Sequence, residues 1–129
     1  MAMERNYPRD LSRLDDLTDY EIPGTNRNLK DWDVYGYDDE KIGSIKYLIG
    51  SPSDRKAHLA IVDAGGVFTD RLIAIPLSYF QFRRDDKERV DVPFTKDQIK
   101  NAPQYRENEG NFIPVFEYWA NIPSTTTRK

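Results

Sequence analysis

Short segments in which apolar and polar residues alternate fill the middle of this chain, and they restrict the folds that it can adopt. Successive side chains of a strand point to opposite faces, so an alternation with a period of two predicts a strand. About five or six such segments lie between Trp32 and Phe94, at spacings of roughly 8–14 residues, with turn residues between them. Many short strands joined by turns predict a small antiparallel barrel or sandwich. We favour the barrel, because several strands are only partly apolar on both of their faces. One closed core is then enough to bury their apolar residues.

Turn residues mark the ends of these strands. The sequence DDEK (38–41) closes the first hairpin, and the glycine pair at 65–66 breaks a later strand. Pro76 ends the next strand, because proline has no N–H to donate to a sheet. Residues 80–94 then predict a hairpin with a charged tip.

Two helical segments are predicted outside these strands. Thr95 followed by Gln98 matches a capping box, and Pro103 ends that helix about one turn later. Near the N-terminus, leucines recur every three positions, which predicts one or two helical turns with a small apolar face. These residues are Leu11, Leu14 and Leu17.

The length of the chain fits one domain with a core of its own, since domains usually have roughly 100–150 residues. We expect the 129 residues to divide into a leader with a short helical turn (1–30), a barrel (31–105) and an aromatic C-terminal extension with a disordered end (106–129). The N-terminal sequence is charged from residue 4 and shows no signal peptide. The longest apolar stretches are far shorter than the roughly 20 residues that cross a bilayer. We therefore expect a cytoplasmic protein without a membrane span.

Charge and residue counts argue against several classes of function. Nineteen Lys and Arg against 22 Asp and Glu leave a net charge of −3, whereas a dedicated nucleic-acid binder normally carries a concentrated basic face. With no cysteine, the chain has no disulfide, no thiolate nucleophile and no cysteine-ligated zinc or iron–sulfur centre. With one histidine, it has no multi-histidine metal site. We therefore predict no cofactor, no bound metal and no catalytic residues.

Four local patterns suggest chemistry, and each has a simpler interpretation. Residues 31–42 match a calcium-binding EF-hand frame only in part, because Ile42 stands where a bidentate glutamate is required. The glycine pair at 65–66 lacks the following helix that a phosphate site uses, so we interpret it as a tight turn. Acidic pairs in turns are normally solvated, which argues against acid–base catalysis. His58 shows no signal of a catalytic partner.

One basic cluster lies at the predicted hairpin tip, where acidic residues interrupt it. Neighbouring charges of opposite sign cancel, so a solvated tip is the interpretation that we favour. A nucleic-acid contact is the alternative, and it would use Arg83, Arg84, Lys87 and Arg89.

The apolar run NFIPVFEYWANIP (111–123) follows a polar loop near the end of the chain. Such a run can pack on its own barrel as an extra edge strand, or it can cross to a second copy or to another protein. Both hold if two identical chains exchange the segment, which closes a two-fold dimer. Aromatic anchors dominate many interfaces, so the candidate partner-binding residues are Phe112, Val115, Phe116, Tyr118 and Trp119.

Four sequence blocks, in the order found here, resemble the PRC-barrel family, a small β-barrel named after the H subunit of the photosynthetic reaction centre. The first is DWDVYGYDDEKIGSIKYLI (31–49), with an Ile-Gly-x-Ile step that begins at Ile42. The others are HLAIVDAGG (58–66), RLIAIPLSYFQF (71–82) and FTKDQIKNAPQY (94–105). The N-terminal LDDLTDYEI (14–22) resembles the leader of stand-alone bacterial members.

The resemblance implies a module for assembly or docking that carries no catalytic motif. Members are parts of larger complexes, small proteins linked to the stress response, or factors at the membrane periphery, and a related barrel belongs to a ribosome-maturation factor. We therefore predict a non-catalytic bacterial protein that binds protein and self-associates as a homodimer. The alternatives are an RNA- or ribosome-associated assembly factor, and a ligand-binding barrel with a pocket lined by Tyr35, Tyr37 and His58.

Overall fold

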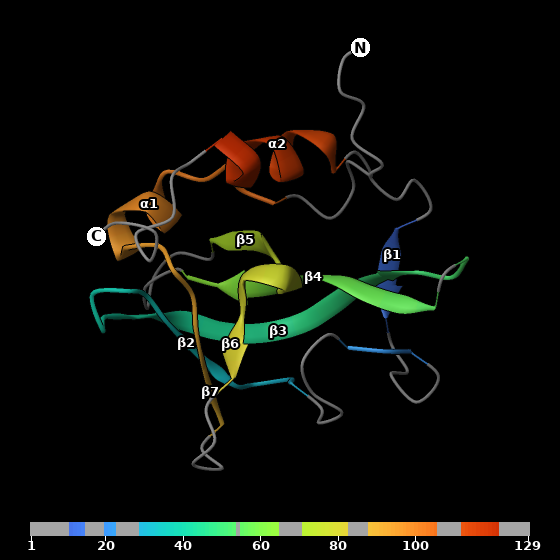
Figure 1. Ribbon diagram of the computed structural model, residues 1–129, viewed down its shortest axis with the longest axis horizontal. Helices are drawn as coiled ribbons and strands as arrows, with labels where there is room; N and C mark the ends of the chain where they lie inside the picture. Colours follow the sequence, from blue (N-terminus) through green and yellow to red (C-terminus); the bar gives the residue numbers. More distant parts are fainter. Residues whose placement is uncertain are drawn as a thin grey trace.

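A computed structural model describes residues 11–14, 20–22, 29–53, 55–64, 71–82, 88–105 and 112–121 of the chain. A curled sheet forms the body of the molecule, and short helices lie along one side of it (Figure 1). The strands are β1 (Ser12–Leu14), β2 (Asp33–Tyr35), β3 (Lys41–Ser51), β4 (Lys56–Asp63), β5 (Leu72–Pro76), β6 (Gln81–Phe82) and β7 (Arg89–Asp91). The helices are the 3-10 turn η1 (Leu77–Tyr79), α1 (Lys96–Lys100) and α2 (Ile113–Asn121).

The strands follow the order β5-β4-β3-β2-β7-β6, and β1 pairs with β3 off this path. The pairings among these strands are antiparallel except that of β2 with β7, which is parallel. The predicted small β-barrel is confirmed as a curled half-barrel, with a mixed sheet in place of a purely antiparallel one. The parallel pair arises because β6 and β7 form the predicted hairpin, and its return strand runs beside β2 in the same direction. The tip of this hairpin, 83–87, lies outside the described residues.

β3 is the longest of these strands and pairs with β4 along one edge and with β2 and β1 along the other. Its register against β4 shifts between Ile45 and Tyr47 and again between Ile49 and Gly50. Between the two irregularities the pairing is regular, and Leu48 is buried together with its neighbours on both sides, so both faces of the sheet are covered here.

Gly43 lets β3 and β4 approach each other closely. A Cβ atom at this position would lie 2.0 Å from the backbone oxygen of Asp63, where real Cβ atoms are essentially never found. Any other residue here would force the two strands apart. The Ile-Gly-x-Ile step in the sequence therefore has a structural reason, because Ile42 and Ile45 are buried on either side of this contact.

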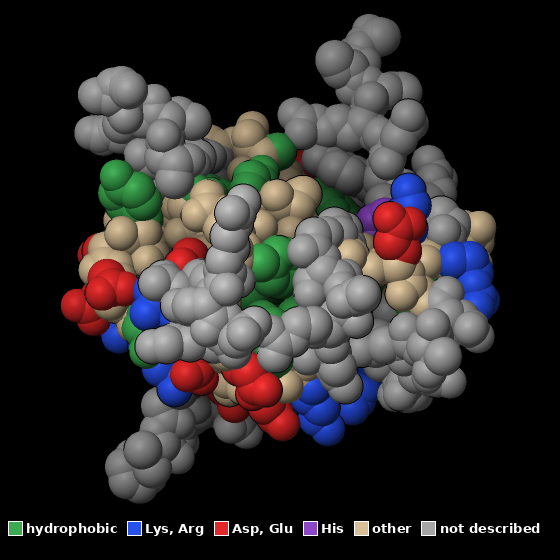
Figure 2. Space-filling model, turned by 60° about the horizontal axis from the view of Figure 1, so that its bottom comes forward, with side chains coloured by type: hydrophobic (Ala, Val, Ile, Leu, Met, Phe, Trp, Pro, Cys, Tyr) green, Lys and Arg blue, Asp and Glu red, His purple; other side chains and the backbone are tan. Residues whose placement is uncertain are grey.

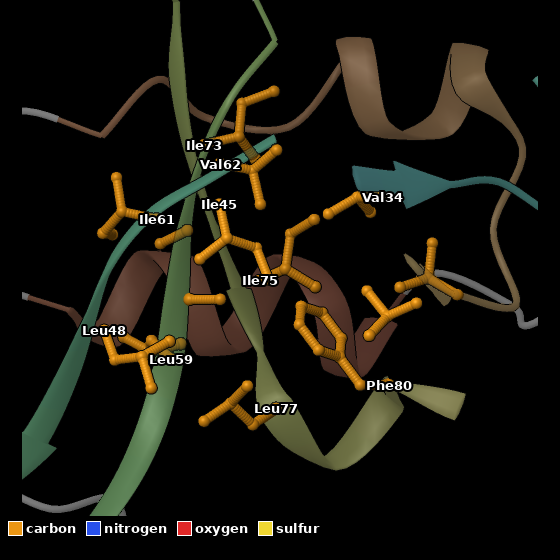
Figure 3. Packing of buried hydrophobic residues seen from close by; sticks show 14 of the residues in the cluster. Val34, Ile45, Leu48, Leu59, Ile61, Val62, Ile73, Ile75, Leu77 and Phe80 are labelled. Atoms are coloured by element: carbon orange, nitrogen blue, oxygen red, sulfur yellow. The ribbon is translucent and has the colours of Figure 1, made fainter. Parts of the chain in front are cut away.

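The core lies inside the curl of the sheet, where side chains of β3, β4 and β5 meet those of the later elements (Figure 3). Burying one large aliphatic side chain contributes about 1.5–3 kcal/mol relative to leaving it exposed, so this cluster supplies a large part of the stability of the barrel. Its fully buried members on the three strands include Ile45, Leu59, Ile61, Val62, Ile73 and Ile75.

The N-terminal leader contributes a strand where the leucine spacing predicts a helix. Residues 12–14 form β1, which pairs antiparallel with β3. This pairing satisfies backbone groups of β3 beyond the stretch that β2 covers, and the tertiary contact overrides a weak local pattern. The helical prediction is therefore wrong at these residues, and Leu17 lies outside the described residues.

The predicted capping box at the start of α1 is confirmed. Thr95 N–H donates to Oε1 of Gln98 at 2.9 Å, and Gln98 N–H donates to Oγ1 of Thr95 at 3.3 Å. At the other end, the Arg71 guanidinium donates to the carbonyl oxygens of Lys100 and Ala102. Since Arg71 directly precedes β5, these bonds fasten α1 to the edge of the sheet.

The apolar C-terminal segment forms the helix α2, and not the extra edge strand considered from the sequence. Its buried residues Val115 and Trp119 are four positions apart, which is the repeat of one helix face. The helix lies over β5 (Figure 1), and no other strand or helix is contacted more by it among the described residues. The segment therefore covers the edge strand without joining the sheet.

Candidate interaction site at the edge of β5

β5 lies at one end of the strand order and pairs with β4 alone. In such a strand, every second residue directs its backbone groups away from the neighbouring strand. The carbonyl oxygen of Leu72 accepts a hydrogen bond from Tyr105 N–H at 2.7 Å. The carbonyl oxygen of Ala74 accepts one from Nε1–H of Trp119 at 2.8 Å. Pro76, the next residue in this series, has no N–H to offer. The later part of the chain thus supplies donors to two carbonyl oxygens of this edge.

Trp119 occupies an aromatic seat between α2 and the sheet, where it is 1% exposed. Its ring centre lies 4.8 Å from that of Phe94. Tyr79 packs edge-on against Phe94, and its hydroxyl donates to the carbonyl oxygen of Trp119 at 3.2 Å. We define the aromatic seat as Ala74, Tyr79 and Phe94. Burial of the ring, together with a partner for the indole N–H, makes Trp119 the main anchor of α2.

Tyr118 joins α2 to α1. Its hydroxyl donates to the carbonyl oxygen of Gln98 at 2.5 Å, and its ring lies edge-on to Trp119 with 5.0 Å between the ring centres. Burial disfavours the charged phenolate and raises the pKa of Tyr118 above its ordinary value of 10.0. The hydroxyl therefore keeps its proton, and its ability to donate, to a higher pH than that of an exposed tyrosine.

The five predicted partner-binding residues all lie on α2 or directly before it, but they differ in accessibility. Val115 and Trp119 are buried against the chain's own barrel. Phe112, Phe116 and Tyr118 are half-buried and pack against the same core. A partner could therefore contact only the half-buried residues unless α2 leaves its seat.

Arg89 is the one nucleic-acid candidate that the structure describes. Its guanidinium pairs with Asp39 at 2.7 Å and with Asp91 at 3.0 Å, and it lies 3.7 Å above the ring centre of Tyr35. The hydrogen bond to Asp39 is the main reason that the pKa of Arg89 is raised. We call these four residues the charged clasp, since they hold β7 against β2 and its following turn. The other candidates, Arg83, Arg84 and Lys87, lie outside the described residues.

The residues of the alternative ligand pocket do not come together. Tyr35 pairs with the first residue of β3, whereas His58 lies on β4 opposite the last residues of β3. Tyr35 and His58 therefore lie near opposite ends of β3. Tyr37 is 58% exposed, in the turn that follows β2. These positions do not support the alternative pocket.

The sequence alone did not reveal the residues that receive α2. Trp119 finds its partners Ala74 and Tyr79 at 45 and 40 positions along the chain, and Tyr118 finds Gln98 at 20 positions. Periodicity and capping signals act over a few residues, so they carry no information on pairs at these separations. The aromatic content of α2 was the one available signal, and it identified the anchor without identifying the seat.

Buried polar side-chain atoms all have hydrogen-bond partners within the described part of the chain. In these ranges, no three side chains of His, Cys, Asp or Glu are grouped so that they could hold a metal ion. Among the helices described, none is long and apolar enough to cross a membrane.

Comparison with known protein families agrees with this geometry. Residues 25–99 match the PRC-barrel domain, and this range contains β2 to β7 and most of α1. The chain belongs to the PRC-barrel family. The match ends before α2, so the aromatic helix on this PRC barrel lies beyond the matched range.

A longer relative contains a similar stretch. An uncharacterized protein of Deinococcus radiodurans is 29% identical to this PRC-barrel chain over 100 residues. The aligned part covers 77% of the chain and 36% of that protein, so the chain spans about a third of the length of this relative.

Proposed function

We propose that this PRC-barrel protein is a non-catalytic module for protein–protein interaction and that it self-associates. The observation that carries the proposal is how α2 is held: Trp119 binds a backbone carbonyl of the edge strand and places its ring in the aromatic seat. Tryptophan and tyrosine in desolvated pockets supply much of the binding energy at protein interfaces. The contacts that hold α2 in one chain are therefore of the kind that joins two chains.

The position of the aromatic seat at a sheet edge also supports the proposal. An open edge strand pairs readily with other chains, and proteins cover or block such edges. Here the cover of β5 is a separate helix, while the hydrogen bonds between β4 and β5 run between other groups. The sheet therefore does not need α2 for its own pairing, and an edge with a separate cover is suited to assembly.

Light scattering after size-exclusion chromatography tests self-association on the full chain over about 5–500 µM, a range that brackets micromolar affinities. We expect the mass to rise with concentration from the 15.1 kDa of one chain towards twice that value. The variant Lys46→Ala should give the same masses as the wild type, because Lys46 is exposed on β3, away from the edge strand β5. A measured mass that stays at the mass of one chain over the whole concentration range would overturn self-association.

The alternative, an RNA- or ribosome-associated assembly factor, has less support among the described residues. Arg89 is already neutralised by Asp39 and Asp91. On the face in Figure 2, acidic and basic side chains lie near one another along the rim and do not form one basic patch. RNA binding through basic residues would give retention on immobilised RNA that falls steeply as salt rises. No retention at low salt would rule it out.

A further inference from the structure

We infer that the partner is a second copy of this chain and that the two copies exchange α2, so that Trp119 of each copy occupies the aromatic seat of the other. This inference rests on the proposed self-association. It adds which segment crosses between the copies and where it binds.

The aromatic seat fits a segment with a particular set of groups. That segment must bring an indole N–H to 2.8 Å from the carbonyl oxygen of Ala74 and lay its ring on Phe94. It must also offer a backbone carbonyl to the hydroxyl of Tyr79 and a phenol to the carbonyl of Gln98. The α2 helix of a second copy carries all these groups at the same spacing, so it meets every requirement of the aromatic seat.

α2 can leave its seat without disrupting the sheet. The three hydrogen bonds described above each involve a side chain, from Trp119, Tyr118 or Tyr79, and these three do not belong to a strand ladder. The bond from Tyr105 to Leu72 lies before the helix in the chain, so it can remain when α2 moves. Movement of one helix therefore empties the aromatic seat while β4 and β5 stay paired.

The closed and exchanged forms make the same contacts at the aromatic seat. Their difference in free energy therefore depends on whether α2 and the aromatic seat belong to one chain or to two, and on protein concentration. The exchanged dimer becomes more populated as the concentration rises. Conversion between the forms requires Trp119 to leave a site where it is 1% exposed. The rate of conversion therefore depends on Trp119, which would not hold for a dimer that forms through another surface.

Isotope-filtered NMR on the full chain tests the exchange directly. Equal amounts of isotope-labelled and unlabelled chain are unfolded in urea, mixed and refolded together, and the dimer is isolated. Exchange predicts nuclear Overhauser contacts between the indole of Trp119 in one copy and the ring of Phe94 in the other. A dimer in which these contacts occur only within one chain overturns the exchange and leaves self-association standing. If no dimer forms at any concentration, both proposals fail.

The rate of conversion provides a second test. Trp119→Phe keeps an aromatic ring but removes the N–H that binds Ala74, so dilution of isolated dimer should give monomer roughly fivefold faster than in the wild type. Arg89→Ala is the matched control, because it weakens the barrel at the β2–β7 pair, and it should change this rate by less than about twofold. An unchanged rate for Trp119→Phe, or equal acceleration by both variants, would contradict exchange of α2 alone.

Discussion

The aromatic seat and the charged clasp both fasten a late segment of the chain to the sheet, but they use different forces. The seat holds an uncharged ring that is 1% exposed, and its hydrogen bond goes to a backbone carbonyl. The clasp holds Arg89 between two carboxylates, and 79% of the side chain of Asp39 remains exposed. Water and salt therefore reach the clasp and are excluded from the seat.

This difference in exposure determines how much each contact stabilises the fold. Burial of a large aromatic ring removes apolar area from water at any ionic strength. Exposed ion pairs contribute about 0–1 kcal/mol each and weaken as salt is added. The molecule thus uses buried packing to keep a helix on an edge strand, and charge pairing to hold two strands in register. We expect the seat to dominate stability and the clasp to adjust it.

Trp119→Ala should have the largest effect. The variant leaves a cavity beside Phe94 and leaves the carbonyl of Ala74 without its donor, so we expect the free energy of unfolding to fall by about 3–5 kcal/mol. Urea unfolding followed by circular dichroism measures this loss. Trp119→Phe should lose less, because it retains a ring. A loss below about 1 kcal/mol in the alanine variant would show that the seat does not hold α2.

Arg89→Ala should have an intermediate effect that depends on salt. It removes two ion pairs and the contact with Tyr35, so we expect a loss of about 1–2 kcal/mol at low ionic strength. The difference from the wild type should shrink in about 1 M NaCl, whereas that of Trp119→Ala should not. Arg89→Lys serves as a control that keeps the charge and loses the planar group. Equal salt sensitivity at both sites would contradict the contrast between them.

Tyr118→Phe should have the smallest effect, a loss of about 1 kcal/mol at neutral pH from the missing bond to Gln98. Burial raises the pKa of Tyr118, so the folded chain holds the phenol proton more tightly than the unfolded chain. This contribution is complete below the ordinary value of 10.0 and is lost as the pH rises above it. The stability of the wild type should therefore fall towards that of Tyr118→Phe in alkaline solution. A gap that stays constant or widens would show that the phenol is not held as described.

Much of the barrel could be predicted from the sequence because its signals are local. Alternation located the central strands, and the spacing of Thr95 and Gln98 located α1. The aromatic segment was harder, because a dense apolar run fits both a strand and a helix. The choice between them is made by packing, which buries Val115 and Trp119 one helical turn apart. At β1 the same priority of tertiary contact over local pattern replaced the predicted helical turn.

Only the α2 half of the candidate site could be predicted from the sequence. The aromatic residues of α2 stood out by composition, whereas the aromatic seat is assembled from distant positions. Arg89 shows the same limit. In the sequence it lies among neighbouring acids at a solvated tip, but its closest carboxylate in the structure is that of Asp39, 50 positions earlier.

That long separation has a consequence for how the barrel forms. β3, β4 and β5 pair with sequence neighbours, whereas β2 must wait for β7 before its second edge is covered. Contacts between distant positions carry the cost of closing a long loop and form late in folding. During synthesis, β2 leaves the ribosome long before residue 91 does, so one of its edges stays open while the central hairpins are already complete. An edge strand left open in this interval is a place where another strand can pair.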